Sequence, residues 1–200
     1  MKLILASSSP RRAEILRHAG FSFEIRPTHV DESHLPGEHP ADYVLRLAQA
    51  KSQAAAEDEI IFGEAACVIG ADTAVVVEGE LLGKPAKTED ARRMLLLLRG
   101  KTHEVLTGLS ILAIPEGKRV DHVETTRVTF LNISDQEVEE YISSGEPFDK
   151  AGAYGIQGIG GRFIERIEGC YFNVMGLPVS RLWGFLRGLG WSEPEISYLP

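Results

Sequence analysis

Apolar residues recur along the chain with two different periods, and their order predicts an α/β protein. Short alternating or β-branched runs indicate strands, whereas stripes spaced three or four residues apart indicate helices. The predicted strands span residues 2–6, 21–26, 67–77, 101–114, 119–133 and 162–167. The predicted helices begin at residues 10, 40, 88, 134 and 178. Because strands and helices alternate around one central hairpin, we expect a mixed sheet flanked by helices.

The most apolar predicted strand, residues 67–77, contains a single carboxylate, Asp72. An ionised carboxylate in an apolar strand is costly unless a cation or hydrogen bonds compensate it. One interpretation is a metal ligand or general base that points into a cleft. The alternative is a structural aspartate that accepts hydrogen bonds from a neighbouring loop. The chain returns through a Gly/Pro corner that carries Lys84, and this ammonium fits a metal-and-phosphate site or a plain ion pair.

The first predicted strand leads through Ser7 and two further serines into a helix whose first turn carries Arg11 and Arg12. Ser9 suits the N-cap position, and Pro10 suits the first helical position. The free N–H groups and the dipole at such a helix start attract anions. Because the two arginines oppose the helix dipole, they are interpreted either as solvated side chains or as ligands of an anion.

Residues 27–40 form a predicted loop that holds three histidines and the acidic pair Asp31-Glu32. The histidines are spaced five residues apart, which fits neither a helical face nor a zinc pattern. Asp31 and Glu32 are better metal candidates, because carboxylate oxygens are ligands that Mg²⁺ prefers.

Composition narrows the compartment and the partners. Two hundred residues with 44% hydrophobic content predict one domain over residues 1–200, with residues 191–200 as a loose tail. No apolar run reaches about 18 residues, so no membrane span is expected. Two distant cysteines form no CxxC pair and favour the cytoplasm. The net charge of −8 argues against nucleic-acid binding and favours a local cationic pocket for a small anion.

Common nucleotide-binding motifs do not match. Residues 79–84 resemble a P-loop, but one residue is missing between the glycines and Pro85 stands where Ser or Thr is required. The glycine-rich residues 149–161 lack the dinucleotide fingerprint and its strand-to-helix context. Their glycine density predicts a loop or hinge that brings backbone close to a ligand, with Lys150 and Gln157 as polar candidates.

A family resemblance rests on four segments in order: Leu5-Ala6-Ser7-Ser8-Ser9-Pro10-Arg11-Arg12, Gly70-Ala71-Asp72-Thr73, Gly83-Lys84-Pro85, and the ten residues DKAGAYGIQG from Asp149 to Gly158. These segments resemble the signatures of the Maf family of nucleoside triphosphate pyrophosphatases, and the resemblance extends to about Trp191. It implies an α/β fold with a long bent sheet and a cleft between two lobes, like the inosine triphosphate pyrophosphatases. It also implies a homodimer.

The implied reaction is hydrolysis of a small-molecule nucleoside triphosphate to its monophosphate and pyrophosphate, aided by Mg²⁺, Mn²⁺ or Co²⁺. Asp72 matches the family's catalytic aspartate, described as a proton acceptor. Glu32, Lys51 and Lys84 match further site positions. By its position between apolar residues of a helix, Lys51 also fits a plain solvated side chain.

In the family branch that acts on dTTP and UTP, Arg11, Thr73 and Gln157 match the positions that set specificity. Gln157 both donates and accepts hydrogen bonds, which suits the mixed edge of thymine or uracil. Alternatively, its amide satisfies the loop backbone. Ser8 stands where some relatives have Gly, a small change that should leave the predicted anion site at the start of the first helix intact.

Electrostatics indicates why a cation is expected. Two unit charges about 4 Å apart interact by about 4 kcal/mol at an effective dielectric constant near 20, so a carboxylate repels a triphosphate strongly. We therefore expect Mg²⁺ or Mn²⁺ on Asp72 and Glu32, where it would bridge phosphate oxygens and orient the attacking water. Lys51, Lys84 and the two arginines would neutralise the phosphates.

Two other functions fit the same residues. One is the family branch that prefers 7-methyl-GTP, and the other is a regulator of growth or septum formation that binds a nucleotide without turnover. Release of pyrophosphate distinguishes an enzyme from a sensor, and competition between substrates distinguishes the two branches.

Overall fold

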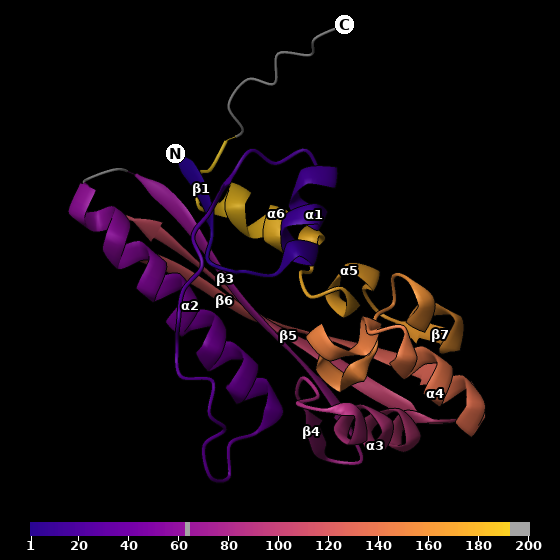
Figure 1. Ribbon diagram of the computed structural model, residues 1–200. Helices are drawn as coiled ribbons and strands as arrows, with labels where there is room; N and C mark the ends of the chain where they lie inside the picture. The colour runs from indigo at the N-terminus through magenta and orange to yellow at the C-terminus, as the bar shows by residue number, and fades with distance from the viewer. Residues whose placement is uncertain (63–64, 193–200) are drawn as a thin grey trace, which may run out of the picture. The chain divides into compact units, whose positions relative to one another are not determined.

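The computed structural model describes residues 1–62 and 65–192 (Figure 1). Its strands are β1 (Lys2–Leu5), β2 (Glu24–Ile25), β3 (Ala66–Val77), β4 (Glu80–Leu82), β5 (Thr102–Ile114), β6 (Lys118–Phe130) and β7 (Ile164–Glu168). Its helices are α1 (Pro10–His18), α2 (Pro40–Phe62), α3 (Thr88–Leu98), α4 (Asp135–Ser143), α5 (Tyr171–Val174) and α6 (Val179–Gly188). Three 3₁₀ turns are η1 (Glu146–Asp149), η2 (Ala151–Ala153) and η3 (Ile159–Phe163). No helix among the described residues is long and apolar enough to cross a membrane.

The strands form one mixed sheet in the order β2-β1-β3-β5-β6-β7, with β4 paired to β3. β1 runs parallel to β2 and to the first part of β3, whereas β3–β4 and β6–β7 are antiparallel. The turn between β3 and β4 places Glu78 and Gly79 at φ values of 50° and 82°, which suits a tight hairpin. The predicted α/β class with a mixed sheet is therefore confirmed.

The chain packs into two compact units. The first unit contains residues 1–72, 108–123 and the segment from Gly176 onward, and the second contains residues 73–107 and 124–175. Strands β3, β5 and β6 contribute residues to both units. The single domain expected from the sequence stays a prediction.

In the first unit, helix α2 lies directly against strands β3 and β5. A Cβ atom on Gly70 of β3 would lie 2.0 Å from the carbonyl oxygen of Ala48, and one on Gly108 of β5 would lie 2.2 Å from that of Val44. Only glycine permits such a close approach of helix backbone to strand backbone. The two glycines therefore set the position of α2 on the sheet.

The C-terminal segment is partly held in this unit. Trp191 is 4% exposed, donates a hydrogen bond of 3.1 Å from Nε1 to the carbonyl oxygen of Met1, and packs against Phe21 with ring centroids 5.8 Å apart. The loose tail expected from residue 191 onward therefore does not include Trp191. Residues 193–200 of the predicted tail lie outside the described residues.

In the second unit, helices α3 and α4 lie side by side (Figure 1) and cover an apolar core. Phe130, Tyr141 and Phe163 are essentially fully buried in it, and burying such a side chain typically contributes about 1.5–3 kcal/mol. The predicted capping box at the start of α4 is confirmed, because Ser134 Oγ accepts from Glu137 N and the Glu137 carboxylate accepts from Ser134 N. This local sequence signal fixes where α4 begins.

His103 on β5 is a buried titratable group in the same core. Its side chain is 2% exposed, and Nε2 shares a hydrogen bond of 2.7 Å with the hydroxyl of Tyr154. Its ring also packs edge-on against Phe130. Burial lowers the pKa of His103 to about 4, because an imidazolium would lose its hydration there. His103 is therefore neutral in the folded protein at neutral pH.

Mild acid is expected to destabilise the protein through His103. The pKa of His103 is about 4 in the folded protein, against an ordinary value of 6.5 that applies to the unfolded chain. As the pH falls, the unfolded chain therefore binds a proton at His103 before the folded protein does. The contribution of neutral His103 to the free energy of unfolding should be at its maximum above pH 6.5. Between pH 6.5 and 4 it should fall by about 1.4 kcal/mol per pH unit. Urea denaturation at several pH values measures this slope. His103→Gln should reduce it, and the exposed control His18→Gln should keep it; an unchanged slope in His103→Gln would contradict the assignment.

Candidate functional site

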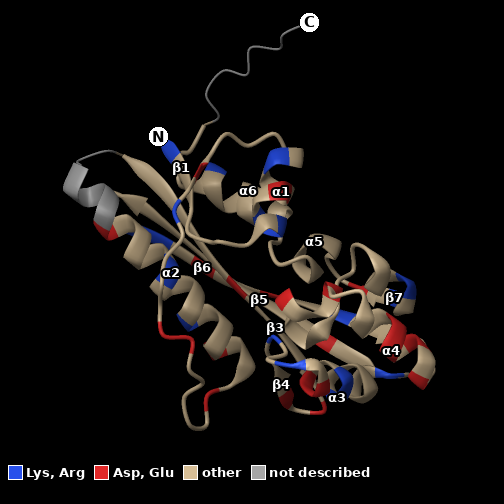
Figure 2. Ribbon diagram, viewed as in Figure 1, with Lys and Arg blue, Asp and Glu red and all other residues tan. Residues whose placement is uncertain are grey.

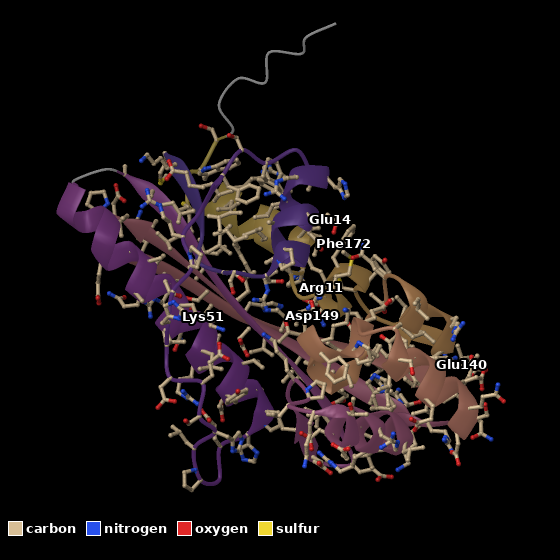
Figure 3. The ribbon with its side chains drawn as sticks, in the orientation of Figure 1. Arg11, Glu14, Lys51, Glu140, Asp149 and Phe172 are labelled. Atoms are coloured by element: carbon tan, nitrogen blue, oxygen red, sulfur yellow. The ribbon has the colours of Figure 1, made fainter. Side chains whose placement is uncertain are left out.

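Lys51 on helix α2, labelled in Figure 3, joins two of the predicted site carboxylates. Its ammonium donates to Asp72 Oδ1 at 2.7 Å and lies 2.6 Å from Glu32 Oε1. The Lys51 side chain is buried, so its interpretation as a solvated helix residue is wrong. Asp72 has a side-chain cation as its partner, and the two carboxylates with one ammonium form a charged cluster in which Lys51 and Asp72 are largely buried and Glu32 is exposed.

The position of Lys51 follows from the packing of α2 on β3. Gly70 lies two residues before Asp72 on the same strand, and Ala48, whose carbonyl lies against Gly70, is one turn before Lys51 on the helix. Residues three apart on a helix lie on the same face. The backbone contact at Gly70 therefore brings the Lys51 ammonium to the Asp72 carboxylate.

The loop that carries Glu32 is held by two side chains of α2. Tyr43 donates from its hydroxyl to the carbonyl oxygen of Glu32 at 3.0 Å. Arg46 donates from Nη2 to the carbonyl oxygen of Ser33 at 3.0 Å and forms a two-point pair with the Glu38 carboxylate. The hydrogen bond from Arg46 lowers the pKa of Glu38 to about 2, so this pair stays ionised well into acid. The predicted loop is thus an ordered structure that presents Glu32 to Lys51.

The two carboxylates of this cluster suit a hard cation, to which each would supply one ligand. Asp72 and Glu32 offer carboxylate oxygens, the type that Mg²⁺ and Mn²⁺ prefer, and both already lie within 3 Å of the same ammonium. No group of three or more His, Cys, Asp or Glu side chains suited to a metal occurs in residues 1–62 and 65–192. A cation on Asp72 and Glu32 would therefore need water or substrate oxygens to complete its coordination.

Arg12 is a buried cation at the start of α1, whose first turn is basic (Figure 2). Its Nε donates to the carbonyl oxygen of Gly176 at 2.7 Å, and its Nη1 donates to Ser7 Oγ at 3.0 Å. Burial lowers the pKa of Arg12, whereas the charge of Asp72 acts in the opposite direction. The interpretation of Arg12 as a solvated side chain is therefore wrong. Arg11 is half-buried at the same helix start (Figure 3).

Thr73, in the second unit, begins a chain of buried polar groups. Thr73 Oγ1 lies 3.0 Å from Thr107 Oγ1, and Thr107 donates to the carbonyl oxygen of Asn173 at 3.1 Å. The amide of Asn173 donates to Val105 O and to Thr126 Oγ1. Because buried hydroxyls need partners, this network holds the side chain of Thr73 in one orientation.

The Gly/Pro corner with Lys84 and the glycine-rich segment are tied together in the second unit. Gly152 N donates to Gly83 O at 3.0 Å, which places the backbone before Lys84 next to the segment. Lys84 is exposed and Gln157 is half-buried. The ammonium of Lys150 lies 2.6 Å from Glu146 O and 2.6 Å from Asp149 Oδ1, and its assignment to substrate binding stays a prediction.

Sequence reasoning missed several residues around these candidates. Thr107 lies in β5 together with other polar residues, so its residue type alone does not single it out. Asn173 lies on the four-residue helix α5, which is too short to produce a periodic pattern. Glu146 accepts backbone hydrogen bonds from the glycine-rich segment, and a loop acid gives no such signal in sequence.

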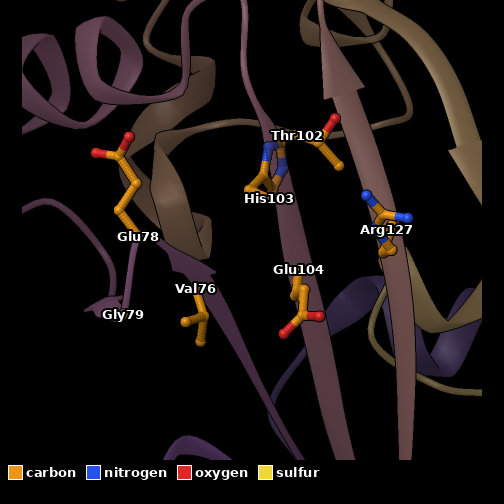
Figure 4. Close-up of a pocket in the computed structure, with 7 residues that line it drawn as sticks. All are labelled: Val76, Glu78, Gly79, Thr102, His103, Glu104 and Arg127. Atoms are coloured by element: carbon orange, nitrogen blue, oxygen red, sulfur yellow. The ribbon is translucent and has the colours of Figure 1, made fainter.

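A surface hollow of about 250 Å³ occurs in the second unit (Figure 4). It is lined by Val76, Glu78, Gly79, Thr102, His103, Glu104 and Arg127. None of the site residues predicted from the sequence lines it.

Comparison with known proteins gives three findings. A family model described as Maf-like protein matches residues 2–189. A protein named dTTP/UTP pyrophosphatase from Koribacter versatilis (strain Ellin345) is 51% identical to the chain, and the alignment covers 95% of both sequences. A protein of the same name from Anaeromyxobacter dehalogenans (strain 2CP-1) is 48% identical, and that alignment covers 96% of both sequences. Among solved structures, the Staphylococcus aureus Ham1 protein matches 94% of this chain and 100% of its own, at 14% identity and a TM-score of 0.49.

Proposed function

The chain belongs to the Maf-like protein family, and from this membership we propose that it hydrolyses dTTP and UTP to the nucleoside monophosphate and pyrophosphate. The family resemblance inferred from the four sequence segments is confirmed by the match over residues 2–189. The relatives named dTTP/UTP pyrophosphatase support the choice of substrates, since they align along almost the whole chain. The observation that carries the chemistry is the cluster in which Lys51 contacts both Asp72 and Glu32.

In the proposed reaction, Asp72 accepts a proton from the attacking water. Lys51 holds the Asp72 and Glu32 carboxylates close together although their charges repel each other. Pyrophosphatases of this family are typically metal-dependent, and Asp72 and Glu32 would hold Mg²⁺, Mn²⁺ or Co²⁺, which supplies positive charge for the phosphates and the water. Arg12 supplies a fixed positive charge, since Ser7 and Gly176 already orient its guanidinium.

The remaining predicted residues are assigned to substrate binding. Arg11 and Lys84 would neutralise phosphate oxygens as charge develops on them. Thr73 and Gln157 would contact the nucleoside, with Thr73 oriented by Thr107. We include a cytoplasmic location and a homodimer in the same proposal.

The function is tested by a panel of triphosphates given to the purified protein with Mg²⁺, Mn²⁺ or Co²⁺. We expect pyrophosphate release to be fastest from dTTP and UTP. Faster release from 7-methyl-GTP, or its dominance in competition, would assign the chain to the other branch. Binding of dTTP without pyrophosphate would instead indicate the regulator.

Base selection is expected to depend on Gln157. Removing a buried amide that pairs with the base typically costs about 1–3 kcal/mol. Gln157→Ala should therefore lower the ratio of kcat/KM for dTTP to that for GTP about tenfold. The exposed residue Gln136 on α4 offers a matched control, and Gln136→Ala should leave the ratio at the wild-type value. An unchanged ratio in Gln157→Ala would mean that the amide serves only the loop backbone.

A further inference from the structure

The glycine-rich segment around Gln157 is folded so tightly that side chains have no room at its glycines. A Cβ atom on Gly158 would lie 2.7 Å from Glu146 Oε2, and one on Gly160 would lie 2.6 Å from the hydroxyl oxygen of Tyr141. Gly158 also has a φ of 85°, a value that other residues rarely adopt. The backbone on the C-terminal side of Gln157 therefore wraps closely around the side chains of Glu146 and Tyr141.

The carboxylate of Glu146 binds this backbone directly. Oε2 accepts from Ile159 N at 2.8 Å, while Oε1 accepts from Gly160 N at 3.1 Å and from the hydroxyl of Tyr141 at 2.9 Å. Burial alone would raise the pKa of Glu146, but the hydrogen bonds from Ile159, Gly160 and Tyr141 lower it overall. Glu146 is thus an ionised acceptor at neutral pH, and hydrogen bonds to an ionised acceptor are the strong ones.

The other side of Gln157 is held by Tyr141 and Lys150. Gly155 N donates to the Tyr141 hydroxyl oxygen at 3.3 Å. The methylene chain of Lys150 packs under Gly155, where a Cβ atom would lie 2.7 Å from Lys150 Cε, and its ammonium donates back to Glu146 O at 2.6 Å. Both flanks of Gln157 are therefore fastened to the same small group of side chains.

We propose that Glu146 and Tyr141 are positioning residues for base selection, because they hold the backbone on both sides of Gln157. This inference rests on the proposed function, in which Gln157 contacts the base. A hydrogen-bonding side chain discriminates between bases only if its direction is set before the ligand arrives. Glu146 and Tyr141 set the direction of the Gln157 side chain through the loop backbone alone, without contacting the nucleotide themselves.

Glu146→Gln is the first test, since it keeps the size of the side chain. The amide cannot replace the carboxylate, because its NH₂ group would face either Ile159 N–H or Gly160 N–H, and two donors repel each other. We expect the dTTP-to-GTP ratio of kcat/KM to fall at least fivefold, chiefly through a higher KM for dTTP. The matched control is Glu140→Gln on the exposed face of α4 (Figure 3), which should keep the wild-type ratio.

Tyr141→Phe is the second variant and removes only the hydroxyl. The ring packing of Tyr141 on Phe163, with centroids 5.2 Å apart, remains possible, so this variant should fold even if Glu146→Gln does not. It should lower the same ratio in the same direction. A thermal melt of each variant checks that the change in the ratio does not arise from unfolding.

A double-mutant cycle separates positioning from a general structural role. In the Gln157→Ala background, Glu146→Gln should change the dTTP-to-GTP ratio less than twofold, because the side chain that it positions is gone. The positioning role would be overturned if Glu146→Gln lowered the dTTP-to-GTP ratio as much in the Gln157→Ala background as in the wild type. An unchanged ratio in both Glu146→Gln and Tyr141→Phe would also overturn it. Those outcomes leave the proposed function intact, provided that the wild-type protein releases pyrophosphate from dTTP. A wild-type protein without that activity would overturn both.

Discussion

Asp72→Asn is expected to lower kcat/KM for dTTP hydrolysis by a factor of about 10²–10⁴, the usual range for loss of a proton acceptor. Asparagine keeps the shape of the side chain but cannot accept the proton of the attacking water. The variant should still fold, because Lys51 keeps its pair with Glu32 at 2.6 Å. The measurement is pyrophosphate release from dTTP with and without Mg²⁺, together with a thermal melt.

A control for charge alone is available in the same unit. Asp42 lies exposed in the first turn of α2, so Asp42→Asn removes one negative charge at a distance from the cluster. It should leave kcat/KM within about twofold of the wild type, since exposed charges interact weakly through solvent. If folded Asp72→Asn releases pyrophosphate at a near-normal rate, Asp72 is not the proton acceptor. Loss of activity in both variants would point to net charge instead.

The order of the elements could be predicted from the sequence because it depends on local signals. The apolar run around Asp72, the proline at the start of α1 and the capping box at Ser134 each act within a few residues, and β3, α1 and α4 form where they indicate. The last helix shows the limit of such signals. Pro178 is its N-cap, and the helix begins one residue later, at Val179.

The contacts within the candidate site could not be predicted, because they depend on how separate elements pack. Lys51 and Asp72 are 21 residues apart, and periodicity alone assigned Lys51 no partner. Their meeting requires the close approach of α2 to β3 at Gly70. Similarly, the acid Glu146 has the composition of a solvated loop residue, and only the fold shows that it binds the backbone around Gln157.

Gly70→Ala is expected to reduce the free energy of unfolding more than ordinary overpacking does, which typically costs about 1–3 kcal/mol. The added methyl group would lie 2.0 Å from Ala48 O and 2.6 Å from Ser52 N. Both neighbours are backbone atoms of α2, so no side-chain rotation relieves the clash and the helix itself must move. Urea denaturation followed by circular dichroism measures the loss.

The same substitution at Gly184 of α6 is the matched control, because a Cβ atom there meets no atom within 4 Å. Alanine has the higher helix propensity, so Gly184→Ala should stabilise the protein by about 0.5–1 kcal/mol. Equal unfolding midpoints for Gly70→Ala and the wild type would contradict the packing of α2 on β3. Where Gly70→Ala still folds, displacement of α2 moves the Lys51 ammonium from Asp72, so dTTP hydrolysis should fall in the molecules that remain folded. A loss of stability with full specific activity would show that the reaction does not depend on the Lys51–Asp72 contact.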